Sequence, residues 1–222
     1  MRENIIQKRK ISAAICEEWL EWDKVLSGRQ KDAIRQYVRM HTDKPEELYQ
    51  IYHAMIRGEN YKAETLEVLM EEGQPVIKIA GNEIRAAFEQ LNDFVQKLIL
   101  LTERTLPLGS VVEVDIRELK LETEKPVSSI KVVIVDRFMK KETEKQYVPY
   151  CGIIYPFGDS KKQLFFTEQA IHTVIHYGYT DRQEDAYVAL IKREIIKKGY
   201  SSYSFAEAED DKIRMLQSDI NL

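Results

Sequence analysis

The chain has 222 residues, of which 33 are basic and 37 acidic, and its formal net charge is -4. This length can bury a hydrophobic core without disulfides or metal ions, and the acidic balance argues against a surface that neutralises many phosphates, so nucleic-acid binding is not expected. The two cysteines, Cys16 and Cys151, lie in different halves without a CxxC spacing, which excludes a disulfide framework and favours a reducing compartment.

The sequence offers no membrane segment. Apolar runs such as Leu98 to Leu101 are far shorter than a bilayer-spanning helix, and the first ten residues lack the apolar core of a signal peptide. We therefore expect a cytoplasmic protein without membrane insertion.

Residues 1–104 predict a helical region. Apolar residues recur at helical spacing from Ile5 to Leu26, and a second helical pattern follows from Ile34 until Pro45. A third helix is expected to start near Pro45, because a cap residue, a proline and two acids follow one another there, and Gly58 is expected to end it.

Further elements of this region are a short helix over residues 63–71, a short strand over 75–79 and a long helix over 82–103. The long helix has the strongest periodicity in the chain, with a four-three-four-three spacing of Ile84, Phe88, Leu91, Val95 and Leu98. Such a stripe ordinarily closes a helical core. The alternative interpretation is a surface that binds a partner through Leu91 and Leu98.

After Thr105 the period changes from helix to strand, so we place a second domain at residues 105–200 and a mobile or helical tail at 201–222. The β-branched and aromatic stretches that predict its strands are 110–116, 130–138, 147–155 and 163–166. Helices are expected at 167–175 and at 180–199, with charged loops such as 120–129 between strands. The fold class is therefore α+β: a helical N-terminal region, then a small antiparallel sheet of three to five strands with C-terminal helices.

No catalytic or cofactor-binding pattern stands out from the residues. His172 and His176 are four residues apart on an expected helix, the spacing of a metal pair, but further ligands and the glutamate of a catalytic zinc helix are missing. Cys151 has no neighbour that would lower its pKa, so it is interpreted as a small buried residue. Trp19 and Trp22 share a helix face and predict either core packing or an exposed recognition patch.

Three short motifs in the second half resemble a known family. They are Leu106-Pro-Leu-Gly-Ser-Val-Val112, Tyr150-Cys-Gly-Ile-Ile-Tyr-Pro-Phe-Gly158, and Leu164-Phe-Phe followed by Ile171, Val174 and Gly178-Tyr179. Together, over about residues 105–185, they are similar to an uncharacterised domain family encoded in type VII secretion loci of Gram-positive bacteria. The order Cys151-Gly152 and a longer charged insertion between the first two strands depart from the family pattern.

The resemblance implies a cytoplasmic adaptor or chaperone-like accessory factor that binds an exported LXG-type toxin. We accordingly expect a protein that binds another protein, without catalytic residues, metal or cofactor. The expected contacts are Leu91 and Leu98 of the long helix or Tyr150 and Tyr155 of the aromatic strand. Two alternatives stay open: an immunity protein whose acidic balance suits a basic toxin domain, and an enzyme that uses His172 and His176.

Overall fold

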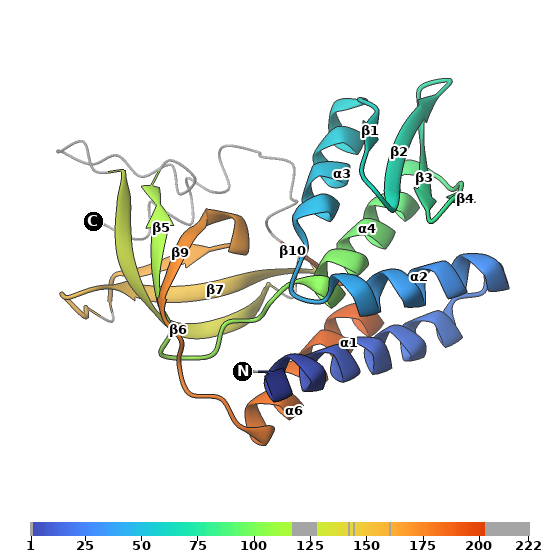
Figure 1. The fold of residues 1–222 in the computed structure, drawn as a ribbon. Coiled ribbons are helices and arrows are strands. Elements are labelled where there is room, and N and C mark those ends of the chain that lie inside the picture. The colour runs from blue at the N-terminus through green and yellow to red at the C-terminus, as the bar shows by residue number, and fades with distance from the viewer. Residues whose placement is uncertain (1, 117–127, 142, 144, 160, 203–222) are drawn as a thin grey trace. The chain divides into compact units, whose positions relative to one another are not determined.

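The α+β class predicted from the sequence is confirmed by the computed structural model, which describes residues 2–116, 128–141, 143, 145–159 and 161–202 (Figure 1). The chain divides into two compact units. Unit 1 holds the described residues up to Thr105 together with Asp185–Gly199, and unit 2 holds Leu106–Glu184 and the described residues from Tyr200 onward. Residues Asp185–Gly199, which include most of the last helix, thus belong with the N-terminal half, whereas the sequence placed them in the C-terminal domain.

Unit 1 combines several helices with a small antiparallel sheet. Its helices are α1 (Arg2–Trp22), α2 (Gly28–His41), α3 (Glu46–Arg57), α4 (Phe88–Thr102) and most of α6 (Arg182–Lys198). Its sheet has the order β1-β2-β3-β4, formed by β1 (Tyr61–Lys62), β2 (Leu66–Glu71), β3 (Gln74–Ile79) and β4 (Asn82–Ile84). None of the helices in the described part of the chain is long and apolar enough to cross a membrane.

The ends of the first helices follow the local signals in the sequence. Ser27 caps α2, because its hydroxyl accepts from the backbone N–H of Gln30 while the Gln30 side chain accepts from the Ser27 N–H. Gly58 ends α3 in the left-handed conformation, and its N–H binds carbonyls of the last turn. The end of α3 at Gly58 confirms the prediction, whereas the cap at Ser27 was not predicted.

The helix predicted over residues 63–71 is wrong, because this segment forms β2. Glu72 and Gly73 both have positive φ and make the two-residue turn that pairs Glu71 with Gln74, which is the favoured geometry for a hairpin. Leu66 and Val68 alternate with more exposed residues and are buried. The strand predicted at 75–79 is confirmed as part of β3.

A second turn of the same kind shortens the long helix predicted over residues 82–103. Ala80 and Gly81 also have positive φ, and they place Asn82 opposite Ile79, so that 82–84 pairs as β4. The helix α4 therefore begins only at Phe88. Its apolar stripe closes the core of unit 1, as the ordinary use of such a stripe predicts.

Unit 2 is built on a six-stranded sheet of order β10-β7-β6-β5-β9, with β8 pairing β7. The strands are β5 (Val111–Asp115), β6 (Ser129–Lys141), β7 (Gln146–Ile154), β8 (Gln163–Phe166), β9 (Ile171–His176) and β10 (Ser201–Ser202). All pairs are antiparallel except β10 with β7, so the sheet has one strand more than the upper expectation. Its core contains Leu106, Val112, Val114, Val132, Ile134, Tyr150, Leu164 and Phe166.

The helix predicted over residues 167–175 is also wrong, because the segment forms the short 3-10 turn η2 (Glu168–Ala170) and then strand β9. Two irregularities interrupt the pairing of β5 with β9, and they allow Ile171 and Val174, three residues apart, both to pack against the core. A spacing of three residues is also that of apolar residues on one helix face, which is why the sequence predicted a helix here. Most of the predicted loop at 120–129 and of the tail at 201–222 lies outside the described residues.

Gly178 is a position where a side chain has no room. A Cβ there would lie 2.0 Å from the carbonyl oxygen of Leu108, which is backbone and cannot rotate away. We predict that Gly178→Ala lowers the free energy of unfolding by about 3 kcal/mol, measured by urea denaturation followed by circular dichroism. Gly28→Ala is the control, since nothing lies within 4 Å of its added Cβ. Equal midpoints for the two variants would contradict the close approach.

Candidate functional site

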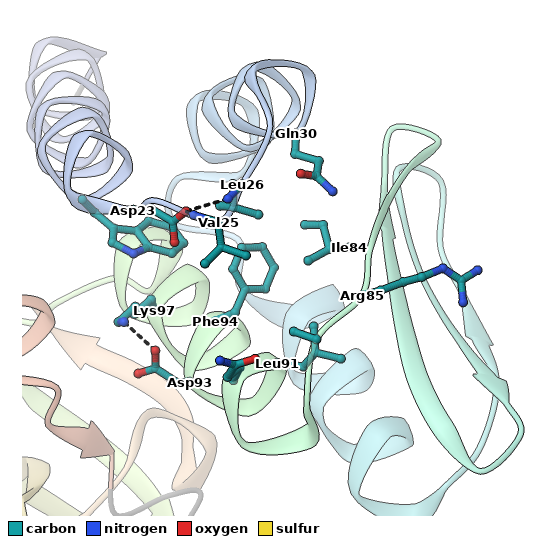
Figure 2. A pocket seen from close by; sticks show the side chains of 13 residues that line it. Asp23, Val25, Leu26, Gln30, Ile84, Arg85, Leu91, Asp93, Phe94 and Lys97 are labelled. Carbon is teal, nitrogen blue, oxygen red and sulfur yellow. Dashed lines mark hydrogen bonds and ion pairs between the residues drawn. The ribbon is translucent and has the colours of Figure 1, made fainter.

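A pocket of about 260 Å³ opens in unit 1 between the α1–α2 connection, β4 and α4 (Figure 2). Its apolar walls come from Trp19, Leu26, Ile84, Leu91 and Phe94. Val25 and Ala86 also line the pocket, and its polar and charged lining residues are Asp23, Gln30, Arg85, Gln90, Asp93 and Lys97. The pocket therefore has the composition of a small binding site, with apolar walls and a few polar groups.

Aromatic rings shape one wall of this pocket. The rings of Trp19 and Phe94 lie 5.7 Å apart at 44°, and the ammonium of Lys97 lies 5.9 Å from the centre of the Trp19 ring. Lys97 also pairs with Asp93 one helical turn away. Trp19 is buried, which agrees with the interpretation of core packing. Trp22 is exposed, as the interpretation of a surface patch requires.

The structure brings one of the two predicted helix contacts to the pocket. Leu91 lines its wall, but its side chain is only 1% exposed, and Leu98 is fully buried in the core. Neither leucine lies on the open surface of unit 1, which corrects the expectation of an exposed contact stripe. The reason is that α4 is surrounded by α1, α2, α3 and β3, which cover its apolar side.

The two predicted tyrosine contacts separate in unit 2. Tyr150 is buried, and its hydroxyl donates to Glu168 at 3.0 Å and accepts from the backbone N–H of Leu106 at 3.1 Å. Tyr150 is therefore a core residue and not a surface contact. Tyr155 follows the end of β7 and is exposed.

A buried arginine lies beside Tyr150. The guanidinium of Arg137 makes a two-pronged ion pair with the carboxylate of Glu184 and donates to the carbonyl oxygen of Leu106 at 3.1 Å. This ion pair was not predicted from the sequence. A charged residue within the apolar run of β6 was the available signal, because a buried arginine requires a carboxylate partner.

Large aromatic side chains are exposed at two places in unit 2. Phe157 is 83% exposed and Tyr179 is 81% exposed, and Tyr155 and Tyr177 are each about half exposed. Tyr155 and Phe157 follow the end of β7, and Tyr177 and Tyr179 follow the end of β9. Of these four residues, only Tyr155 was predicted from the sequence as a contact.

The histidine pair predicted on a helix lies instead on β9. His172 and His176 are both exposed, and four residues of extended chain separate them by about 13 Å, too far to share one ion. Within the described residues, no group of three or more potential ligands from His, Cys, Asp and Glu lies together.

Both cysteines are buried free thiols. Burial is the main cause that raises the pKa of Cys16 to about 12 and that of Cys151 to about 11, with Glu17 and Asp136 adding to the respective shifts. The thiol of Cys151 donates to Gln163 at 3.4 Å. Both groups are therefore neutral and poorly nucleophilic at neutral pH.

Residues 105–187 match the model of a protein family described as "Domain of unknown function (DUF4176)". The C-terminal half thus carries an uncharacterised domain, as its motifs predicted. The match covers well under half of the chain and leaves out most of unit 1, including the pocket. No curated protein and no solved structure matches the chain.

The Arg137–Glu184 pair can be tested against a matched surface pair on the same helix. We predict that Glu184→Gln lowers the free energy of unfolding by about 2–3 kcal/mol, because it leaves a buried guanidinium without its carboxylate. Glu194→Gln removes an exposed pair with Lys198 and is expected to cost less than about 0.5 kcal/mol. Chemical denaturation of both variants measures the difference. Equal losses in the free energy of unfolding would show that the buried pair stabilises the protein no more than the exposed pair does.

Thiol reactivity tests the burial of the cysteines. Because the pKa values of Cys16 and Cys151 are raised, the folded protein at pH 8 is expected to react with Ellman's reagent at least about 100-fold more slowly than the protein in denaturant. The folded state favours the neutral thiols, so their contribution to stability is complete below pH 9.0 and is lost as the pH rises toward 11 and above. Fast labelling of one thiol, located by Cys16→Ala and Cys151→Ala, would contradict its burial.

Proposed function

We propose that the protein is a non-enzymatic cytoplasmic adaptor or chaperone-like accessory factor that binds an exported toxin of a type VII secretion system. Two lines support the proposal. The motifs at Leu106–Val112 and Tyr150–Gly158 resemble a family encoded in such loci, and the domain that carries them displays exposed aromatic side chains. The exposed aromatics are the observation that carries the binding role.

Exposed aromatic residues of this size favour contact with another polypeptide. Tyr and Phe are enriched in the centres of protein interfaces, because their rings bury a large apolar area with few rotatable bonds. Phe157 and Tyr179 are each more than four-fifths exposed. Contact between their apolar rings and water is unfavourable, and a partner that covers the rings removes this contact.

The backbone that carries these aromatics is anchored at both places. The N–H of Tyr155 donates to the carbonyl of Lys131 at 2.9 Å, and the N–H of Gly158 donates to that of Ile154 at 3.0 Å. After β9, the N–H of Gly178 donates to the hydroxyl of Ser110 at 3.0 Å. A partner therefore meets aromatic side chains on an ordered backbone, which reduces the entropy lost on binding.

Co-purification with the toxin encoded beside this gene tests the proposal. We expect the wild-type protein to form a stable complex upon co-expression, and the double variant Phe157→Ser, Tyr179→Ser to weaken it at least ten-fold, because the exposed aromatic area is lost. Isothermal titration calorimetry of the purified components measures the change. Circular dichroism checks that the fold is kept.

Leu190→Ser is the matched control, because Leu190 is an exposed apolar residue of α6 outside residues 105–187. Unchanged affinity in the double variant would remove the aromatic residues from the interface. If the wild type forms no complex with the full toxin but protects cells against its toxic domain, the protein is an immunity factor and the adaptor proposal fails.

A further inference from the structure

The pocket of unit 1 is a second candidate site, separate from the exposed aromatic residues of unit 2. Its volume of about 260 Å³ lies just below the range of drug-sized cavities, and its walls include the rings of Trp19 and Phe94. These two rings pack on each other, with centroids 5.7 Å apart and planes tilted by 44°, so they form one aromatic wall against which a further ring can pack. Figure 2 shows Leu91, Phe94 and Ile84 bordering the same space.

Three of the four charged residues that line the pocket already have a partner of opposite charge. Lys97 and Asp93 form an ion pair with each other. Arg85 binds Glu71 and Glu83, and in Figure 2 its guanidinium points away from Phe94 and Leu91. These groups therefore add little net charge at the mouth of the pocket.

Asp23 is the exception. Its Oδ1 atom accepts from the backbone N–H groups of Val25 and Leu26 at 2.9 and 2.8 Å, which fixes the side chain at the pocket. The ammonium of Lys31 donates to the backbone oxygens of Leu20 and Asp23, not to this carboxylate. Asp23 takes part in none of the ion pairs within the described residues. Its carboxylate therefore gives the mouth of the pocket a negative charge.

We propose that this pocket binds an aromatic side chain that lies next to a cationic amine, as a partner polypeptide presents where an aromatic residue adjoins Lys or Arg. The ring packs against the wall that Trp19 and Phe94 form together, and the cation faces the carboxylate of Asp23. The site goes beyond the function proposed above and does not rest on it, because the lining residues lie outside residues 105–187.

Two small probes that share a phenethyl group and carry opposite charges test the site in the full-length protein. Phenethylamine carries an ammonium on this group, and hydrocinnamate carries a carboxylate. The chain has two tryptophans, so Trp22→Phe leaves the indole of Trp19 as the only reporter. We expect a saturable shift of its NMR signal with millimolar phenethylamine and at least five-fold weaker binding of hydrocinnamate.

Neighbouring alanines supply matched variants in the same background. Ala86 lines the pocket and Ala87 is exposed at the start of α4, so Ala86→Phe is expected to abolish the saturable shift while Ala87→Phe preserves it. Thermal unfolding shows whether each variant remains folded. If Ala86→Phe does not fold, Ala86→Leu replaces it, with Ala87→Leu as its control and the same expected loss.

Asp23→Asn keeps the oxygen that accepts from Val25 and Leu26 but removes the charge. It is expected to reduce the preference for phenethylamine over hydrocinnamate to within two-fold while both still bind. The proposal is overturned if neither probe shifts the Trp19 signal saturably, if the anion binds as well as the cation, or if filling the pocket leaves binding unchanged.

Discussion

A single buried guanidinium organises the C-terminal domain. The chain enters unit 2 at Leu106 and leaves it at Glu184, and Arg137 binds the carbonyl of the first residue and the carboxylate of the second. Tyr150 completes the arrangement, because its hydroxyl accepts from the N–H of Leu106 and donates to Glu168. A buried arginine is tolerated only with such partners, so Arg137 links Leu106 to Glu184 while Tyr150 holds the N–H of Leu106.

The two units differ in how they could contact other molecules. Unit 2 has a closed core around Val112, Val132 and Phe166, and it exposes its large rings at Phe157 and Tyr179. Unit 1 buries many of its apolar side chains and has a partly open pocket beside Trp19. A surface of exposed rings suits a broad protein contact, whereas a small pocket suits one anchoring side chain. Both kinds of contact fit a binding protein.

The predicted contact residues show how burial changes the meaning of an apolar pattern. Leu91, Leu98 and Tyr150 were identified from their periodicity and residue type, and each lies inside a core. Apolar periodicity reports which face of an element is covered, and it does not report whether the cover is the same chain or a partner. Tyr155 alone of the four lies at the surface, and the more exposed Phe157 lies two residues further along.

The sequence by itself determined the α+β class, the helices up to Gly58, the strands β5 to β8 and the start of the family-like domain at residue 105, because caps, turn residues and hydrophobic period act over a few neighbouring residues. Only the tertiary structure decided that β2 and β9 are strands. Their identity depends on pairing with β3 and β5, and the irregular pairing of β9 gives Ile171 and Val174 a helical spacing. The Arg137–Glu184 pair and the pocket beside Trp19 likewise join residues that are 47 and up to 78 positions apart, a distance over which local signals carry no information.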